Sequence, residues 1–140
     1  MEIEDVIIKA DTLGANGLIF PKDVIIEAVR NYRDRPDLKV GKITSKKNEF
    51  QLHEVTHKIK WVDFFEEENS AKAMIELLDT AASKVIYNDP YAYFLNPVLS
   101  IDIVEQEDGS AIVKGLEIIR VDVIHKPEFK TNSFIKEDST

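Results

Sequence analysis

The stretch FQLHEVTHKIKWVDF, residues 50–64, decides the fold class because it carries the clearest strand pattern in the chain. It also holds two of the three histidines and the only tryptophan. From Val55 to Phe64 the residues alternate between two faces, which is typical of a long, half-buried β-strand. One face is expected to carry Val55, His57, Ile59 and Trp61, and the other Thr56, Lys58, Lys60, Val62 and Phe64.

The two histidines of this stretch are the first candidates for catalysis. If the strand extends back to His53, then His53 and His57 share a face and lie about 13 Å apart, at about 3.3 Å per residue. That distance is too long for the pair to share one proton or one metal ion. We therefore expect His57 to be a packed histidine, with the role of general base as the alternative.

Composition restricts the functions open to the chain. Its 140 residues suit one domain. With 18 Lys and Arg against 26 Asp and Glu, the net charge is −8, which argues against nucleic acid or an anionic membrane surface as partner. The absence of cysteine excludes disulfides, thiolate zinc sites and cysteine nucleophiles. No apolar run approaches the roughly 18–20 residues of a membrane span. We expect a soluble, intracellular protein without a cofactor.

The elements before this strand follow from local patterns. Glu2–Lys9 alternates weakly and predicts a first strand, which ends in a turn at Gly14–Gly17. Pro21 is suited to the first position of a helix, and apolar residues recur after it at helical spacing as far as Tyr32. Leu38–Thr44 predicts a short strand that leads into a polar turn.

The second half of the chain predicts a β-hairpin. Val98–Val104 and Ala111–Ile124 are rich in β-branched residues and are separated by Asp108-Gly109, a turn signal. Ser70–Ile86 is ambiguous, because its propensity favours a helix whereas its alternation up to Leu77 favours a strand. Glu66–Glu68 is expected to be a solvated loop and not a metal site, because three adjacent carboxylates seldom converge on one ion. The sum is an α+β fold with a mostly antiparallel, barrel-like sheet.

Five stretches, taken in order, resemble the tailed-phage prohead (capsid maturation) protease family. They are KADTLGANGLIFPKDVIIEAVRNY at residues 9–32, Gly41–Ser45, Val55–Ile59, Ile75–Lys84 and Val121–Pro127. The resemblance implies the herpesvirus assemblin-like fold, a small antiparallel β-barrel with flanking helices. It implies one domain over residues 1–127 followed by a polar tail at 128–140. It also favours a strand from Ser70 to about Leu78 followed by a short helix, and we adopt that assignment.

The departures from the family concern its catalytic groups. The family's catalytic histidine lies in a Gly-His-Pro element, which falls here at or beside Ser45, and no histidine precedes His53. Its nucleophile lies in a Ser-Ser-Arg-Gly-like stretch, where this chain has Asn96 and Pro97. Proteolysis of this kind needs a serine, a histidine that takes its proton, and donors for the oxyanion. The resemblance therefore implies a catalytically inactive relative.

These observations predict a structural protein of the phage head. The chain is expected to act as a decoration, cement or auxiliary protein in the virion, or in the host cytoplasm during assembly. Its partners would be the major capsid protein or other head proteins, with self-association as a further option. Aromatic residues around Asn88–Pro90, in an expected loop, are the candidates for the contact surface. They are Tyr87, Tyr91, Tyr93 and Phe94.

Two alternatives remain open. The first is an active prohead maturation protease with a rearranged site, in which Ser100 is the nucleophile and His57 or His125 is its base. Ser100 is the only serine near the expected nucleophile position, and it lies within an apolar run. The second is a regulator that resembles a scaffold and binds the genuine protease.

Overall fold

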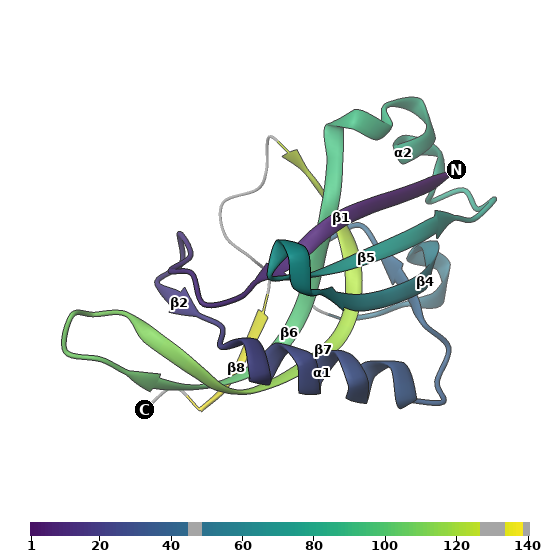
Figure 1. The fold of residues 1–140 in the computed structure, drawn as a ribbon. Coiled ribbons are helices and arrows are strands. Elements are labelled where there is room, and N and C mark those ends of the chain that lie inside the picture. Colours follow the sequence, from purple (N-terminus) through teal and green to yellow (C-terminus); the bar gives the residue numbers. More distant parts are fainter. Residues whose placement is uncertain (45–48, 127–133, 139–140) are drawn as a thin grey trace.

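Two four-stranded sheets form the fold, and the computed structural model describes residues 1–44, 49–126 and 134–138. The strand orders are β1-β5-β4-β3 and β2-β7-β6-β8. Figure 1 shows β1, β5 and β4 side by side in the first sheet. All pairs within the first sheet are antiparallel, as is β6–β7, whereas β2–β7 and β6–β8 are parallel. The strands are β1 (Glu2–Lys9), β2 (Leu18–Ile19), β3 (Val40–Lys42), β4 (Val55–Phe65), β5 (Ser70–Leu77), β6 (Tyr93–Glu105), β7 (Ala111–His125) and β8 (Phe134–Asp138).

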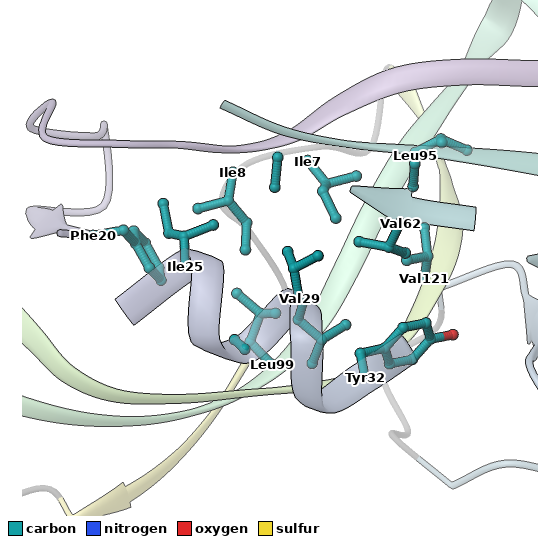
Figure 2. Packing of buried hydrophobic residues seen from close by; sticks show 14 of the residues in the cluster. Ile7, Ile8, Phe20, Ile25, Val29, Tyr32, Val62, Leu95, Leu99 and Val121 are labelled. Carbon is teal, nitrogen blue, oxygen red and sulfur yellow. The ribbon is translucent and has the colours of Figure 1, made fainter. Parts of the chain in front are cut away.

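Helix α1 (Lys22–Asp34) covers the core that the two sheets share. It begins at Lys22, so Pro21 is its N-cap and not its first residue as predicted. Asp23 lies in its first turn, where a negative charge suits the helix dipole. Its buried face packs between side chains of the first sheet, such as Ile7, and side chains of the second, such as Leu99 (Figure 2). The remaining helices are α2 (Lys84–Asn88) and the 3₁₀ turns η1 (Leu52–Glu54), η2 (Glu66–Glu68) and η3 (Pro90–Ala92).

Strand β4 confirms the predicted strand, but the residues beyond Ile59 point to the opposite sides of the sheet from those predicted. The pairing with β5 shifts between Ile59 and Trp61, which is a β-bulge. A bulge adds one unpaired residue, so the alternation of side chains reverses beyond it. Val62 is therefore in the core and Trp61 is only half-buried, which corrects the expectation that Trp61 shares the buried face of Ile59. His53 lies in η1 and so is not part of the strand face that carries His57.

The second half of the chain matches the predicted elements, with changes at their ends. β5 is a strand followed by the short helix α2, as adopted above. The hairpin of β6 and β7 turns at Gly109, whose φ of +88° suits glycine. β6 begins at Tyr93, earlier than predicted, so Tyr93 and Phe94 lie in a strand and not in a loop. The backbone of residues 134–138 pairs with β6, a strand that the sequence did not predict.

The two sheets are joined where the end of β3 meets β7. Ile43 and Val123 form a parallel bridge, and the Thr44 amide donates to the Val123 carbonyl at 2.7 Å. Gly41, two residues before Ile43, lies at the same junction. A Cβ at Gly41 would lie 2.2 Å from the Val121 carbonyl oxygen and 2.3 Å from His57 Nε2. Only glycine therefore allows β3, β4 and β7 to approach this closely.

We predict that Gly41→Ala strongly destabilises the protein, because the added methyl group meets a backbone carbonyl and a fully buried ring, neither of which can move freely. A cost of about 3 kcal/mol or more in the free energy of unfolding is expected, measured by equilibrium urea denaturation. Gly115→Ala on β7 is the matched control, because its Cβ would meet Asp102 Cβ at 3.2 Å, a much milder contact. Equal losses in the two variants would contradict the role assigned to Gly41.

Candidate functional site

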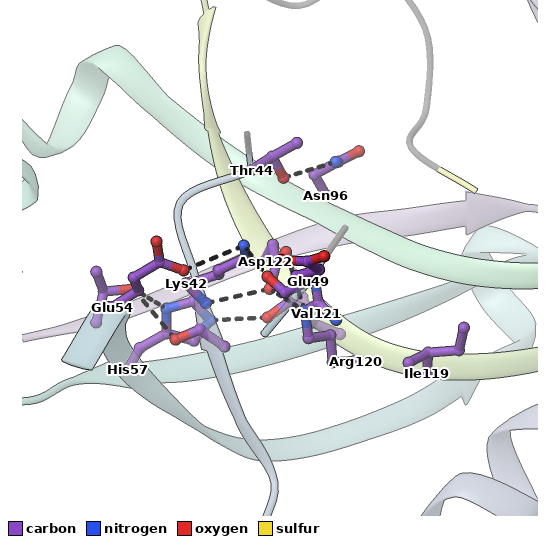
Figure 3. Close-up of polar contacts among 12 residues, drawn as sticks. Lys42, Thr44, Glu49, Glu54, His57, Asn96, Ile119, Arg120, Val121 and Asp122 are labelled. Carbon is purple, nitrogen blue, oxygen red and sulfur yellow. Dashed lines mark hydrogen bonds and ion pairs between the residues drawn. The ribbon is translucent and has the colours of Figure 1, made fainter. Parts of the chain in front are cut away.

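His57 lies at the junction of the two sheets and is fully buried. Its Nε2 is 2.7 Å from the Val121 carbonyl oxygen, and its Nδ1 is 2.7 Å from Thr56 Oγ1 (Figure 3). A carbonyl oxygen can only accept, so Nε2 carries the proton and donates it. Nδ1 then accepts from the Thr56 hydroxyl. Both ring nitrogens are thus engaged, Nε2 with β7 and Nδ1 with the preceding residue of β4, and together the two bonds confine the ring to a single orientation.

The surroundings of His57 keep its ring neutral. Burial lowers the pKa of His57 to about 4, and the hydrogen bond with the Val121 carbonyl only partly opposes this. The imidazole is therefore uncharged at neutral pH. His57 is thus a packed, neutral histidine, as expected. The expectation was one hydrogen-bonded ring nitrogen, and the structure has two.

A buried charged network lies beside this histidine. Asp122 accepts from the Lys42 amide at 3.1 Å and from Arg120 Nε at 2.9 and 3.1 Å. Burial raises the pKa of Asp122, and the Arg120 guanidinium counteracts it. The Lys42 ammonium is also buried and donates to the Glu49 carbonyl, with Glu54 Oε2 3.3 Å away. Figure 3 shows that these groups connect η1, β3 and β7.

Asn96 and Pro97, two of the three positions that the resemblance marks as vacated, lie at the same junction. Asn96, on β6, is fully buried, and its Nδ2 donates to Thr44 Oγ1 at 3.0 Å. Thr44 is the neighbour of Ser45, which itself lies outside the described residues. Pro97 is paired with Val121, the residue whose carbonyl binds His57. The fold thus brings together two segments that are about fifty residues apart in the sequence, and their side chains here are an amide and a hydroxyl.

An open cleft of about 600 Å³ adjoins this junction. Its walls combine hydroxyl, imidazole and carboxylate groups with small apolar side chains from the loop before α2. The residues are Ile43, Thr44, His53, Glu54, Thr56, Ala81 and Ala82. Thr44 connects the cleft to Asn96, and Thr56 connects it to His57. The cleft therefore borders the junction through these two threonines.

Ser100 is not brought to either histidine. It is buried on β6, and its Oγ has no hydrogen-bond partner among the residues that the structure describes. Pro97 pairs with Val121, the β7 residue that His57 contacts. Ser100 lies three residues beyond Pro97, which is about 10 Å farther along β6. His125 packs against the ring of Tyr93 at 5.2 Å between centroids, at the far end of the same hairpin. No serine–histidine hydrogen bond forms in the described part of the chain.

The four aromatic residues proposed for an interface divide into two pairs. Tyr91, in η3, is 88% exposed, and Tyr87, in α2, is 39% exposed. Tyr93 and Phe94 are half-buried on β6. The exposed aromatic surface is therefore smaller than the sequence indicated and centres on Tyr91.

The acidic run after β4 is engaged in ion pairs. Glu66 contacts Lys22, and Glu68 contacts Lys72. Within residues 1–44, 49–126 and 134–138, no group of three histidine or acidic side chains could hold a metal ion. No helix in that part of the chain is long and apolar enough to cross a membrane.

Sequence reasoning missed the polar residues that build the junction. The sequence pattern indicates only strands for four of these residues, Lys42, Thr44, Thr56 and Asp122. One signal was present, since Asp122 interrupts the apolar run Val121–Ile124. A charged residue inside a predicted core strand requires a buried partner, and that requirement points to a polar network.

Comparison with known proteins identifies the fold. No protein-family model matches the chain, and no curated protein matches it in sequence. Among solved structures, the chain is similar to the bacteriophage T4 capsid assembly protease, gp21, with a TM-score of 0.71 and 14% sequence identity. The similarity covers 89% of this chain and 81% of that chain. It confirms the predicted α+β fold with mostly antiparallel sheets.

We predict that stability falls on acidification because of His57. Its folded-state pKa of about 4 is below the value of 6.5 for an ordinary histidine. The unfolded chain therefore binds a proton in the window between these values while the folded chain does not. This contribution is complete above pH 6.5, decreases as the pH falls to 4, and amounts to about 3 kcal/mol. Urea denaturation across this range measures it.

The His57→Gln variant should lose this part of the pH dependence, whereas the contribution of Asp122 is present in both proteins and cancels in the comparison. His53→Gln is the matched control, because it removes an exposed histidine near the same cleft. An NMR titration of the His57 ring provides the direct measurement. A midpoint near pH 6.5 would contradict the assigned burial and hydrogen bonding.

Proposed function

We propose that this chain, which has the fold of a phage capsid assembly protease, is a non-catalytic protein of the phage head that acts through protein–protein contacts. The hydrogen bond from Asn96 to Thr44 carries the proposal. The resemblance expects a nucleophile at this position. Asn96 places an amide there, and an amide oxygen does not attack an acyl group as a serine hydroxyl does.

The chemistry of acyl transfer supports this proposal. A serine protease needs a hydroxyl within hydrogen-bond reach of a base, and a place for the reacting carbonyl beside both. The only hydroxyl in contact with His57 among the described residues is that of Thr56. Thr56 has no exposed surface, although it borders the cleft. A substrate carbonyl could not reach its Oγ1 without opening the junction.

The proposed partners are the major capsid protein or other head proteins, with self-association as a second option. Tyr91 is the strongest anchor candidate, because a large, exposed tyrosine can bury its ring and still satisfy its hydroxyl at the edge of an interface. The net charge of −8 would favour a partner surface with positive charge. The fold's occurrence in a capsid assembly protein supports the head as the setting.

One observation favours the alternative of an active protease. Ser100 Oγ is buried and has no hydrogen-bond partner among the described residues, so its hydroxyl is not committed to a structural contact. A rearrangement that brought a histidine to Ser100 would produce a nucleophile and base. The separation along β6 and the two bonds of His57 oppose it.

We predict that a fluorophosphonate probe does not label the protein, because within residues 1–44 and 49–126 no hydroxyl near the junction is both accessible and activated. Mass spectrometry of the probe-treated protein measures the result, with an active serine hydrolase as positive control. Labelling of Ser100 that disappears in Ser100→Ala would reject the non-catalytic proposal in favour of the alternative.

We predict that Tyr91→Ser weakens the binding of the purified protein to phage heads at least tenfold, because the variant removes an exposed ring that an interface would bury. Co-sedimentation with heads at increasing protein concentration measures the affinity. Leu13→Ser is the matched control, since Leu13 is also an exposed apolar residue, at 58%, but lies between β1 and β2. Equal binding by wild type and Tyr91→Ser would exclude Tyr91 as an anchor.

A further inference from the structure

A second pocket of about 320 Å³ lies outside the cleft described above, where the end of α1 meets β3 and β7. Tyr32 and Phe50 contribute its aromatic walls, and Arg35, Lys39 and Arg120 contribute positive charge. Asp37 is the only acidic residue among those that line it. Arg35 pairs with Asp37 and Arg120 with the buried Asp122, so Lys39 is the cation of this lining that forms no ion pair with a described residue, in a chain whose net charge is −8.

Two of these cations lie over the same aromatic ring. Arg35 Cζ is 4.8 Å and Lys39 Nζ is 5.5 Å from the centroid of the Tyr32 ring. Arg35 is held firmly, because its guanidinium donates to the Ile118 and Ile119 carbonyls at 2.9 and 2.8 Å and also pairs with Asp37. The positive charge at this pocket is therefore fixed in place by the backbone of β7.

Lys39 retains hydrogen-bonding capacity. An ammonium group has three donors, and in the described part of the chain Lys39 Nζ makes one hydrogen bond, to the Arg35 carbonyl at 2.7 Å. The Lys39 side chain is half-buried, so a ligand that it binds is partly shielded from water. A charge-assisted hydrogen bond in such a place is stronger than one on an open surface.

Tyr32 provides an independent indication of a ligand. The residue is only 2% exposed, and its hydroxyl has no hydrogen-bond partner among the described residues. Figure 2 shows this hydroxyl directed away from the other labelled core side chains. A buried, unpaired hydroxyl is costly unless something occupies its donor. Burial raises the pKa of Tyr32, so the group stays protonated and can donate to an acceptor.

We infer that this pocket binds an oxyanion, a carboxylate or a phosphate group, through Lys39 Nζ and the Tyr32 hydroxyl. The donors, the fixed positive charge and the unpaired hydroxyl all call for an acceptor with negative charge. A cation would be repelled by Arg35 and Lys39, and an apolar ligand would leave the hydroxyl unpaired. The ligand source is a free phosphate or the acidic side chain of a bound protein, which share this chemistry.

The test uses the full chain at low ionic strength and two probes, inorganic phosphate and acetate, with chloride as the ionic-strength control. Amide NMR signals of residues 35–40 and 118–120 should shift saturably with at least one oxyanion and not with chloride. Saturation by phosphate alone assigns the site to phosphate, whereas saturation by acetate assigns it to carboxylates. Shifts that are linear up to 50 mM with both probes would overturn the inference.

Variants identify the groups responsible. Lys39→Gln should weaken binding of the saturating probe at least tenfold, and Tyr32→Phe at least threefold. Lys114→Gln is the matched control, since it removes the same charge from an exposed side chain on β7 and should change the affinity less than twofold. If both variants weaken binding of the probe equally, the loss reflects the overall charge of the protein and not a specific site, and the inference is overturned.

Thermal unfolding supplies a second readout for Tyr32. Without an oxyanion, Tyr32→Phe should match or exceed the melting temperature of the wild type, because it removes an unpaired buried hydroxyl. With the saturating probe, the wild type should gain a few degrees and Tyr32→Phe less than half of that gain. An equal gain in both proteins would exclude the hydroxyl from the site.

Discussion

The hydrogen bond from His57 Nε2 to the Val121 carbonyl is the contact on which the arrangement of the two sheets depends. It connects β4 of the first sheet to β7 of the second, and it can form only because Gly41 has no side chain between them. Around it, Lys42 and Thr44 bond to Asp122 and Val123, so β3 is fastened to β7 by backbone and side chain together. Lys42, His57 and Asp122 are buried, and their polar groups would be costly if left unpaired.

This constraint also limits what the junction can do chemically. A catalytic histidine must exchange a proton with a reacting group, whereas His57 is held neutral by burial and uses both nitrogens for structure. Asn96 and Thr44 likewise bond to one another. The described polar groups of the junction are thus engaged in joining the two sheets. The cleft beside them is lined by both polar and apolar side chains.

Local patterns predicted most elements well, and they failed where long-range pairing intervened. Pro21 and the helical spacing after it identified α1, and alternation identified β4. The bulge beyond Ile59 could not be read from the sequence, because it arises from the pairing with β5, and it moved Trp61 out of the core. The order of the five stretches drew attention to Asn96 and to the residue after Thr44, and the assignment of these positions to the family's catalytic groups stays a prediction. Their hydrogen bond, and the buried network of Lys42 and Asp122, required the fold.

The sequence by itself determined the α+β class, the presence of the main helix and of the hairpin, and the lack of a serine, arginine or glycine at Leu95–Val98. These depend on the period of apolar residues, on turn chemistry and on residue identity, which are all local properties. Only the tertiary structure decided that His57 is a neutral connector and that Tyr32 has an unpaired hydroxyl beside fixed cations. The state of a polar side chain depends on burial and on partners contributed by distant strands, and no local pattern contains that information.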